Sequence, residues 1–132
     1  MELTAEITAI RDGSGDPARL LGEFRRAVLL VPLADGPDAG LMSAVSGGIR
    51  WIYAFTDEEA LARFAQARGE AGREWEFLAV LGARLVDAVI PAADGPAGVV
   101  VNVADEDGSM FFPPVAGIVP DGSAVDLAGA VA

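Results

Sequence analysis

The side chains that most often carry out catalysis or bind metals are missing from this chain. Its 132 residues include no His and no Cys, and all nine basic residues are Arg. Without imidazole or thiol groups there is no Ser-His-Asp triad, no Cys nucleophile and no His or Cys metal ligand. Without Lys there is neither a P-loop nor a Schiff base. The sequence therefore predicts no catalytic residue, no cofactor and a non-enzymatic role.

Carboxylates are the remaining groups that could support chemistry. A carboxylate-based hydrolase would need a pair among Glu58, Glu59, Glu74 and Glu76 in one cleft, about 5 to 9.5 Å apart. Nothing in their spacing indicates such a pair. The acidic turn at residues 105–108 resembles half of a calcium loop, but the twelfth position holds Ala instead of the required Glu. No metal site is predicted.

One cation interrupts an otherwise apolar segment. Arg50 lies inside the predicted strand 49–55, and a buried guanidinium needs an anionic partner. In one interpretation Arg50, with Trp51 and Tyr53, holds the carboxylate of a small amino-acid-like ligand. In the other, Arg50 pairs with a neighbouring carboxylate such as Glu74 or Glu76.

An aromatic pair followed by a proline pair is the candidate interaction surface. Alternation along a strand sends Phe111 and Phe112 to opposite faces, so one can be buried while the other is exposed. Pro113 and Pro114 would block further strand pairing and blunt a sheet edge. The alternative interpretation is a turn that closes the core.

Composition predicts a single globular domain. Apolar residues make up 52% of the chain and charged residues 22%, which excludes a mostly disordered protein. The net charge of −11 opposes binding to nucleic acid or to an anionic membrane surface and favours a basic protein partner. We therefore expect a cytoplasmic protein with a protein partner or a homo-oligomeric state, and with no nucleic acid or membrane.

Local signals place several elements. Asp16 and Pro17 are typical of a helix start, and this helix should end near residue 27. Thr56 and Glu59 form a capping box that should start a helix running to about residue 68. Apolar runs predict strands at 28–33, 41–46, 49–55, 98–103 and 115–119, with a tight turn at 47–48. The strand 49–55 carries apolar residues on both faces, which is typical of a central, covered strand.

Two segments remain ambiguous. Residues 1–10 fit helical and strand spacing equally. For residues 73–90 we favour a strand at 75–80 followed by a helix at 81–89, over one long helix. The mixture predicts an α+β domain, with a mixed and largely antiparallel sheet and helices packed on it. We assign an N-terminal segment at 1–23, the domain at 24–120 and a tail at 121–132.

The order of these motifs resembles the N-terminal domain of the SseB family, of the type found in actinobacterial sequences. The similarity covers about residues 24–120 and lies in the segments 28–33, 48–61, 98–102 and 110–114. The family tends to show an Asn-Pro pair where this chain has Asn102 and Val103. The resemblance implies an accessory protein with no established enzymatic activity, catalytic residue or cofactor. We therefore expect a protein-interaction module, with a sensor of small anionic ligands as the alternative.

Overall fold

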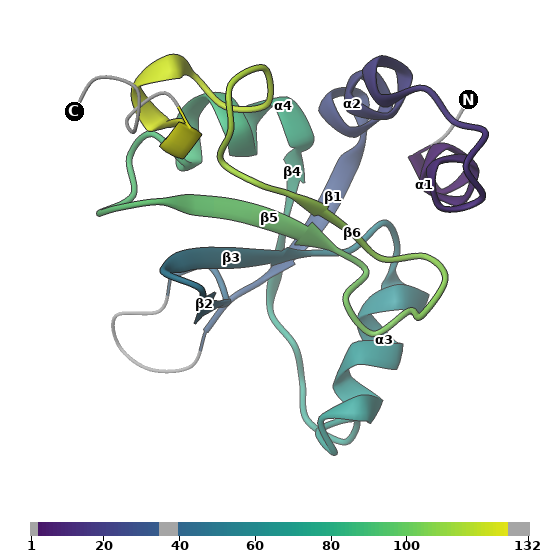
Figure 1. Cartoon of the computed structure of the whole chain (residues 1–132). Coiled ribbons are helices and arrows are strands. Elements are labelled where there is room, and N and C mark those ends of the chain that lie inside the picture. The colour runs from purple at the N-terminus through teal and green to yellow at the C-terminus, as the bar shows by residue number, and fades with distance from the viewer. Residues whose placement is uncertain (1–2, 35–39, 127–132) are drawn as a thin grey trace.

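The computed structural model describes residues 3–34 and 40–126, which form an α+β fold (Figure 1). The helices are α1 (Leu3–Arg11), α2 (Pro17–Arg26), α3 (Glu58–Ala67), the short α4 (Gly82–Arg84), the π-helix η1 (Leu85–Val89) and the 3-10 helix η2 (Asp121–Ser123). The strands are β1 (Val28–Pro32), β2 (Ser43–Ser46), β3 (Ile49–Ala54), β4 (Phe77–Leu81), β5 (Ala97–Val101) and β6 (Met110–Phe112).

The strands form two small sheets. Strands β1 and β4 make an antiparallel pair, and a second sheet has the order β2-β3-β5-β6. Among the strands that the structure describes, only β3 and β5 run parallel, and α3, β4, α4 and η1 lie between them in the chain. Leu30 and Phe55 exchange backbone hydrogen bonds of 2.8 Å in both directions, which joins β1 to the end of β3.

The N-terminal half follows its local signals closely. The Asp16 carboxylate accepts a hydrogen bond from the Ala18 N–H, and Pro17 is the first residue of α2, as predicted. The ambiguous first segment is helical, because Leu3 and Ile7 lie one turn apart and both enter the main core. Gly47 and Gly48, with φ of 62° and 79°, form the predicted turn between β2 and β3.

The predicted capping box at Thr56 is wrong by one residue. Asp57 is the N-cap of α3, and its carboxylate accepts a 2.8 Å hydrogen bond from the Ala60 N–H. The Thr56 hydroxyl instead accepts a hydrogen bond from the Asn102 side chain, 46 residues further along the chain. Thr56 and Asp57 could both cap this helix, but the Thr56 hydroxyl is already occupied by the hydrogen bond from Asn102, so Asp57 is the cap.

The segment after α3 is a strand followed by a helical turn, as favoured over a single long helix. The break falls at Gly82, where a Cβ atom would lie 1.9 Å from the Phe24 carbonyl oxygen. Only glycine allows α2 to approach so closely. The turn that follows widens into η1, whose Leu85 and Val86 are buried.

The main core lies between the β2-β3-β5-β6 sheet and the N-terminal and central helices. Ile52, Val99 and Phe112 face this core, where the Phe112 ring stacks on Phe24 at a centroid distance of 4.1 Å. Figure 1 shows α2 and α4 on one side of the β3–β5 layer, while α3 lies on the other side near one end. On the core side of β3, Ile52 and Ala54 are buried, whereas Trp51 and Tyr53 on the other side are only half-buried, contrary to the prediction of two covered faces.

The predicted strand at 115–119 is also wrong. This segment is a turn in which Gly117 has φ of 92°, closed by a single bridge between Ala116 and Val119. Side-chain burial explains why the segment is apolar, since Val119 enters the core and Ile118 packs against it. A hydrogen bond from the Val125 N–H to the Pro114 carbonyl holds the following segment in place.

Candidate functional site

The structure separates the three residues of the expected anion clamp. Arg50 lies on one face of β3 and Trp51 and Tyr53 on the other, because neighbouring strand residues point in opposite directions. Arg50 is exposed and donates a 3.0 Å hydrogen bond to the Ser43 hydroxyl. Among the described residues it forms no ion pair with Glu74 or Glu76, so the alternative pairing is not observed either.

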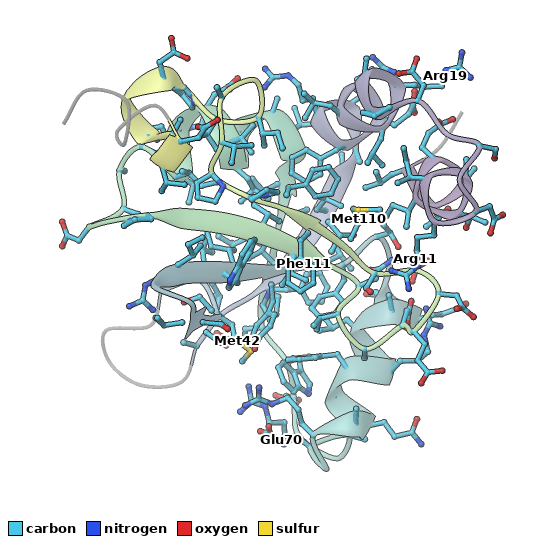
Figure 2. All side chains as sticks on the ribbon, in the orientation of Figure 1. Arg11, Arg19, Met42, Glu70, Met110 and Phe111 are labelled. Atoms are coloured by element: carbon cyan, nitrogen blue, oxygen red, sulfur yellow. The ribbon has the colours of Figure 1, made fainter. Side chains whose placement is uncertain are left out.

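Trp51 and Tyr53 instead lie with Phe111 on the face of the sheet that is opposite α2 and α4. We call these three residues the aromatic face. The Phe111 ring meets Trp51 edge-on, at a centroid distance of 5.0 Å and an interplanar angle of 76°. The ring of Tyr53 packs against the ring of Phe64 in α3, at a centroid distance of 5.0 Å. Figure 2 shows Phe111 reaching from β6 toward β3, on the side where Met42 also lies.

The Trp51 ring of the aromatic face packs closely against strand β5. A Cβ atom at Gly98 of β5 would lie 2.8 Å from the Trp51 ring, so glycine is required for the indole to pack this closely against β5. Phe111 nevertheless remains 55% exposed. A fixed and partly exposed aromatic pair is typical of a protein contact surface.

The two phenylalanines separate as alternation predicts. Phe112 is 2% exposed and belongs to the core, whereas Phe111 faces solvent. Of the two prolines, Pro114 is buried and Pro113 is half-buried. The expected surface of four residues therefore reduces to Phe111 with Pro113 beside it.

Arg50 lines a groove that sequence reasoning did not identify. The groove has a volume of about 630 Å³ and lies between β2–β3 and the η1 segment. Arg84 is its second cation, and its remaining lining is Gly40, Leu41, Ser43, Ile52, Ala88, Val89, Ala92 and Ala93. Arg84 forms no ion pair within the described part of the chain. No local signal links Arg50 to Arg84, because only the packing of η1 on the sheet brings them together.

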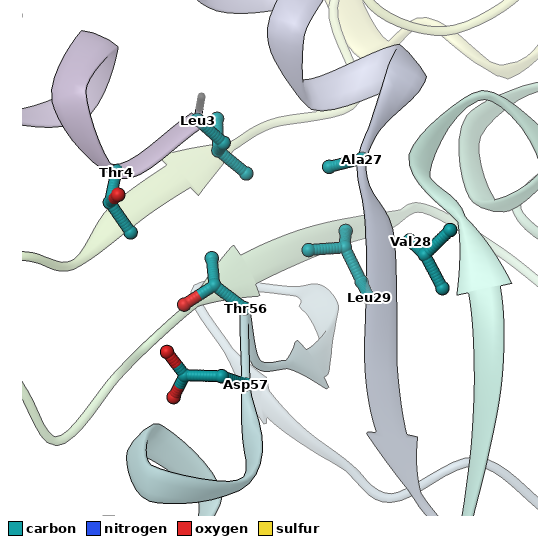
Figure 3. Close-up of a pocket in the computed structure, with 7 residues that line it drawn as sticks. All are labelled: Leu3, Thr4, Ala27, Val28, Leu29, Thr56 and Asp57. Atoms are coloured by element: carbon teal, nitrogen blue, oxygen red, sulfur yellow. The ribbon is translucent and has the colours of Figure 1, made fainter. Parts of the chain in front are cut away.

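A smaller hollow lies where the parallel strands β3 and β5 end (Figure 3). It holds about 160 Å³, below the roughly 300 Å³ typical of ligand sites. Its lining is Leu3, Thr4, Ala27, Val28, Leu29, Thr56 and Asp57. The Asp57 carboxylate already caps α3, and Glu58 and Glu59 follow it, so this helix end does not favour an anion.

Asn102 ties the ends of β3 and β5 together. Its side-chain carbonyl accepts from the Thr56 N–H at 3.0 Å, and its amide donates to the Thr56 hydroxyl at 3.0 Å. The residue is 3% exposed and has φ of 51°, a left-handed conformation that Asn tolerates better than most residues. All its observed contacts are structural.

The acidic turn at 105–108 is held by arginines. Arg63 donates to both carboxylate oxygens of Asp105, at 2.7 and 2.8 Å, and this hydrogen bonding raises the pKa of Arg63. Arg11 donates to the backbone carbonyls of Glu106 and Ser109 (Figure 2). Within residues 3–34 and 40–126 no cluster of three or more acidic residues could hold a metal ion. None of the helices described there is long and apolar enough to span a bilayer.

Comparison with known proteins identifies a protein family that this chain matches. A family model described as the SseB protein N-terminal domain matches residues 3–115. No curated protein and no solved structure matches the chain.

Proposed function

The chain belongs to the SseB family, and on that premise we propose that it is a non-enzymatic accessory module that binds another protein through the aromatic face. The observation that carries this proposal is the exposure of Phe111, at 55%, beside a Trp51 ring fixed on the sheet. Aromatic anchors that are rigid before binding lose little entropy on association and dominate many interfaces.

Charge supports a protein as the partner rather than a nucleic acid. The net charge of −11 repels phosphate backbones and attracts a basic protein surface. The lack of His, Cys and Lys supports a role without catalysis. The partner expected here therefore presents an apolar patch for Phe111 and Trp51 within a basic rim.

The first experiment is affinity purification of the tagged protein from its own cell extract at two salt concentrations. Phe111→Ala should lose the partner, whereas Val45→Ala should keep it, because Val45 is 61% exposed but lies on the opposite face of the sheet. Phe112→Ala is unsuitable, since Phe112 belongs to the core.

Titration calorimetry with the purified partner then measures the effect directly. Truncating an aromatic anchor should raise the Kd by about tenfold or more. Equal affinities of Phe111→Ala and the unsubstituted protein would contradict the proposal, as would the absence of any specific partner.

The groove of Arg50 and Arg84 favours a second candidate function. Two arginines above an apolar lining suit a small ligand that carries a carboxylate and an apolar side chain, such as an amino acid. Under this proposal the protein senses that ligand, and the aromatic face plays no part in binding it.

A thermal-shift screen with a panel of metabolites tests the sensor proposal. A ligand at 100 times its Kd should stabilise the fold by about 2.7 kcal/mol. Arg50→Ala and Arg84→Ala should each remove the shift, while Arg19→Ala on the exposed side of α2 should retain it. The absence of any shift across the panel would exclude the sensor.

A further inference from the structure

Strand β4 is an open edge with an unusual sequence. Its five residues, Phe77–Leu81, are all apolar, and among the described residues it pairs only with β1. Leu78 and Leu81 are 49% and 47% exposed, and Ala79 between them is also exposed. Exposed edges of this kind pair readily with another strand.

The ladder with β1 shows which backbone groups of β4 face outward. The Gly82 N–H donates to the Ala27 carbonyl at one end, and the Leu33 N–H donates to the Glu76 carbonyl at the other. Bonding positions alternate along an antiparallel strand, so the groups of Leu78 and Val80 point toward β1. The N–H and C=O groups of Phe77, Ala79 and Leu81 therefore point away from β1.

The other sheet edges carry protection that β4 lacks. Strand β6 has three residues and runs directly into Pro113 and Pro114. Strand β2 has four residues with a serine at each end. Proteins normally blunt an edge with prolines, charges or short strands. Strand β4 contains no charge and no proline, which indicates that its edge is covered in the functional state.

We propose that β4 pairs antiparallel with β4 of a second copy of this chain, about a two-fold axis at Ala79. This pairing places Phe77 opposite the second copy's Leu81 and Leu78 opposite its Val80. The outward groups of Phe77, Ala79 and Leu81 then bond across the axis. The two β1–β4 pairs become one four-stranded sheet, and the exposed side chains of Leu78 and Leu81 each gain an apolar neighbour from the second copy.

The sequence around β4 matches a second copy in particular. Every cross-strand pair in this register is apolar, so the edge is complementary to itself, as a two-fold interface requires. Glu74 and Glu76 precede β4 and Arg84 follows it, and none of these three forms an ion pair within the described residues. Antiparallel pairing brings the acidic end of one strand beside the basic end of the other.

Charged residues introduced at Ala79, on the two-fold axis, test the proposal. Ala79 is exposed, so Ala79→Lys and Ala79→Glu should leave the monomer folded, as circular dichroism would verify. Two like charges directly opposite destabilise a strand pair, and opposite charges stabilise it. Each variant alone should weaken the dimer Kd at least about tenfold, whereas an equimolar mixture should restore a heterodimer. Val45→Lys, on the β2 edge, is the matched control and should dimerise normally.

Sedimentation equilibrium on purified protein, from about 1 µM to about 1 mM, gives the readout. A protein that stays monomeric over this range would overturn the proposal, and so would a dimer unaffected by Ala79→Lys or a mixture that fails to reassociate. The proposal does not depend on the proposed function, because Phe111→Ala should dimerise normally even if it loses its protein partner.

Discussion

Phe111 and Phe112 show how two neighbouring residues of one type take opposite roles. The Phe112 ring stacks on Phe24 inside the core, whereas Phe111 stands on the aromatic face with Trp51 as its ring contact. The difference follows from the two-residue period of a strand.

The two phenylalanines should therefore differ in their effect on stability. Phe112→Ala should lower the free energy of unfolding by about 3 to 5 kcal/mol, because it leaves a cavity in the core. Phe111→Ala should lower it by less than about 1 kcal/mol, since its ring is largely exposed. Urea denaturation of both variants checks this. Similar losses in the two would contradict the assignment of faces.

Asn102 should stabilise the fold in two separable ways, through its hydrogen bonds to Thr56 and through its tolerance of a left-handed backbone. Asn102→Ala leaves the Thr56 N–H without its acceptor, at a cost of about 1 to 3 kcal/mol, and adds roughly 1 kcal/mol for the left-handed backbone. Asn102→Gly loses the same hydrogen bonds but relieves the backbone, so it should be more stable than Asn102→Ala. Thermal denaturation distinguishes the two, and equal stability would exclude the backbone contribution.

At the scale of elements, an ion pair joins α2 to η1. Arg25 donates to both oxygens of Asp87, at 3.0 and 2.6 Å. This hydrogen bonding lowers the pKa of Asp87 and raises the pKa of Arg25. Both side chains are substantially exposed, so the pair contributes no more than about 1 kcal/mol.

The contribution of this pair should depend on pH in one direction. Because the pKa of Asp87 is lowered by folding, the stabilisation is complete above the unfolded pKa of about 3.9 and disappears as pH falls through the folded pKa. Asp87→Asn should be less stable than the unsubstituted protein at neutral pH, and the difference should shrink as pH falls through 4 to 3. Urea titrations across this range measure it. A difference that stays constant or grows on acidification would contradict the linkage.

At the scale of the whole molecule, the charge imbalance should limit stability. A net charge of −11 on 132 residues opposes compaction through self-repulsion, and the exposed ion pairs offset little of it. Raising sodium chloride from roughly 0.05 to 0.5 M shortens the screening length about threefold, so Tm should rise. Calorimetric melts at low protein concentration provide the measurement. A fall in Tm would indicate that attractive ion pairs outweigh the repulsion.

The arrangement of the whole sheet also explains why residues that are neighbours in the chain do not form one site. The predicted anion clamp consists of neighbours in the chain, yet Trp51 joins Phe111 from β6, and Arg50 shares a groove with Arg84 beside η1. Each of these pairs depends on the order β2-β3-β5-β6 and on how the helices pack against it. Residue types therefore indicate which side chains can take part in binding, whereas tertiary packing determines which side chains lie together.

The sequence by itself determined the family, the α+β class and most element positions. Signals such as Asp16 with Pro17, or Gly47 with Gly48, act through sterics and hydrogen bonds within a few residues, so they can be read locally. Only the tertiary structure decided that Asp57 caps α3, that residues 115–119 form a turn, and that β4 lies at an open edge. These features depend on contacts between distant segments: Asn102 holds Thr56 across 46 residues, and core packing holds an apolar turn that resembles a strand.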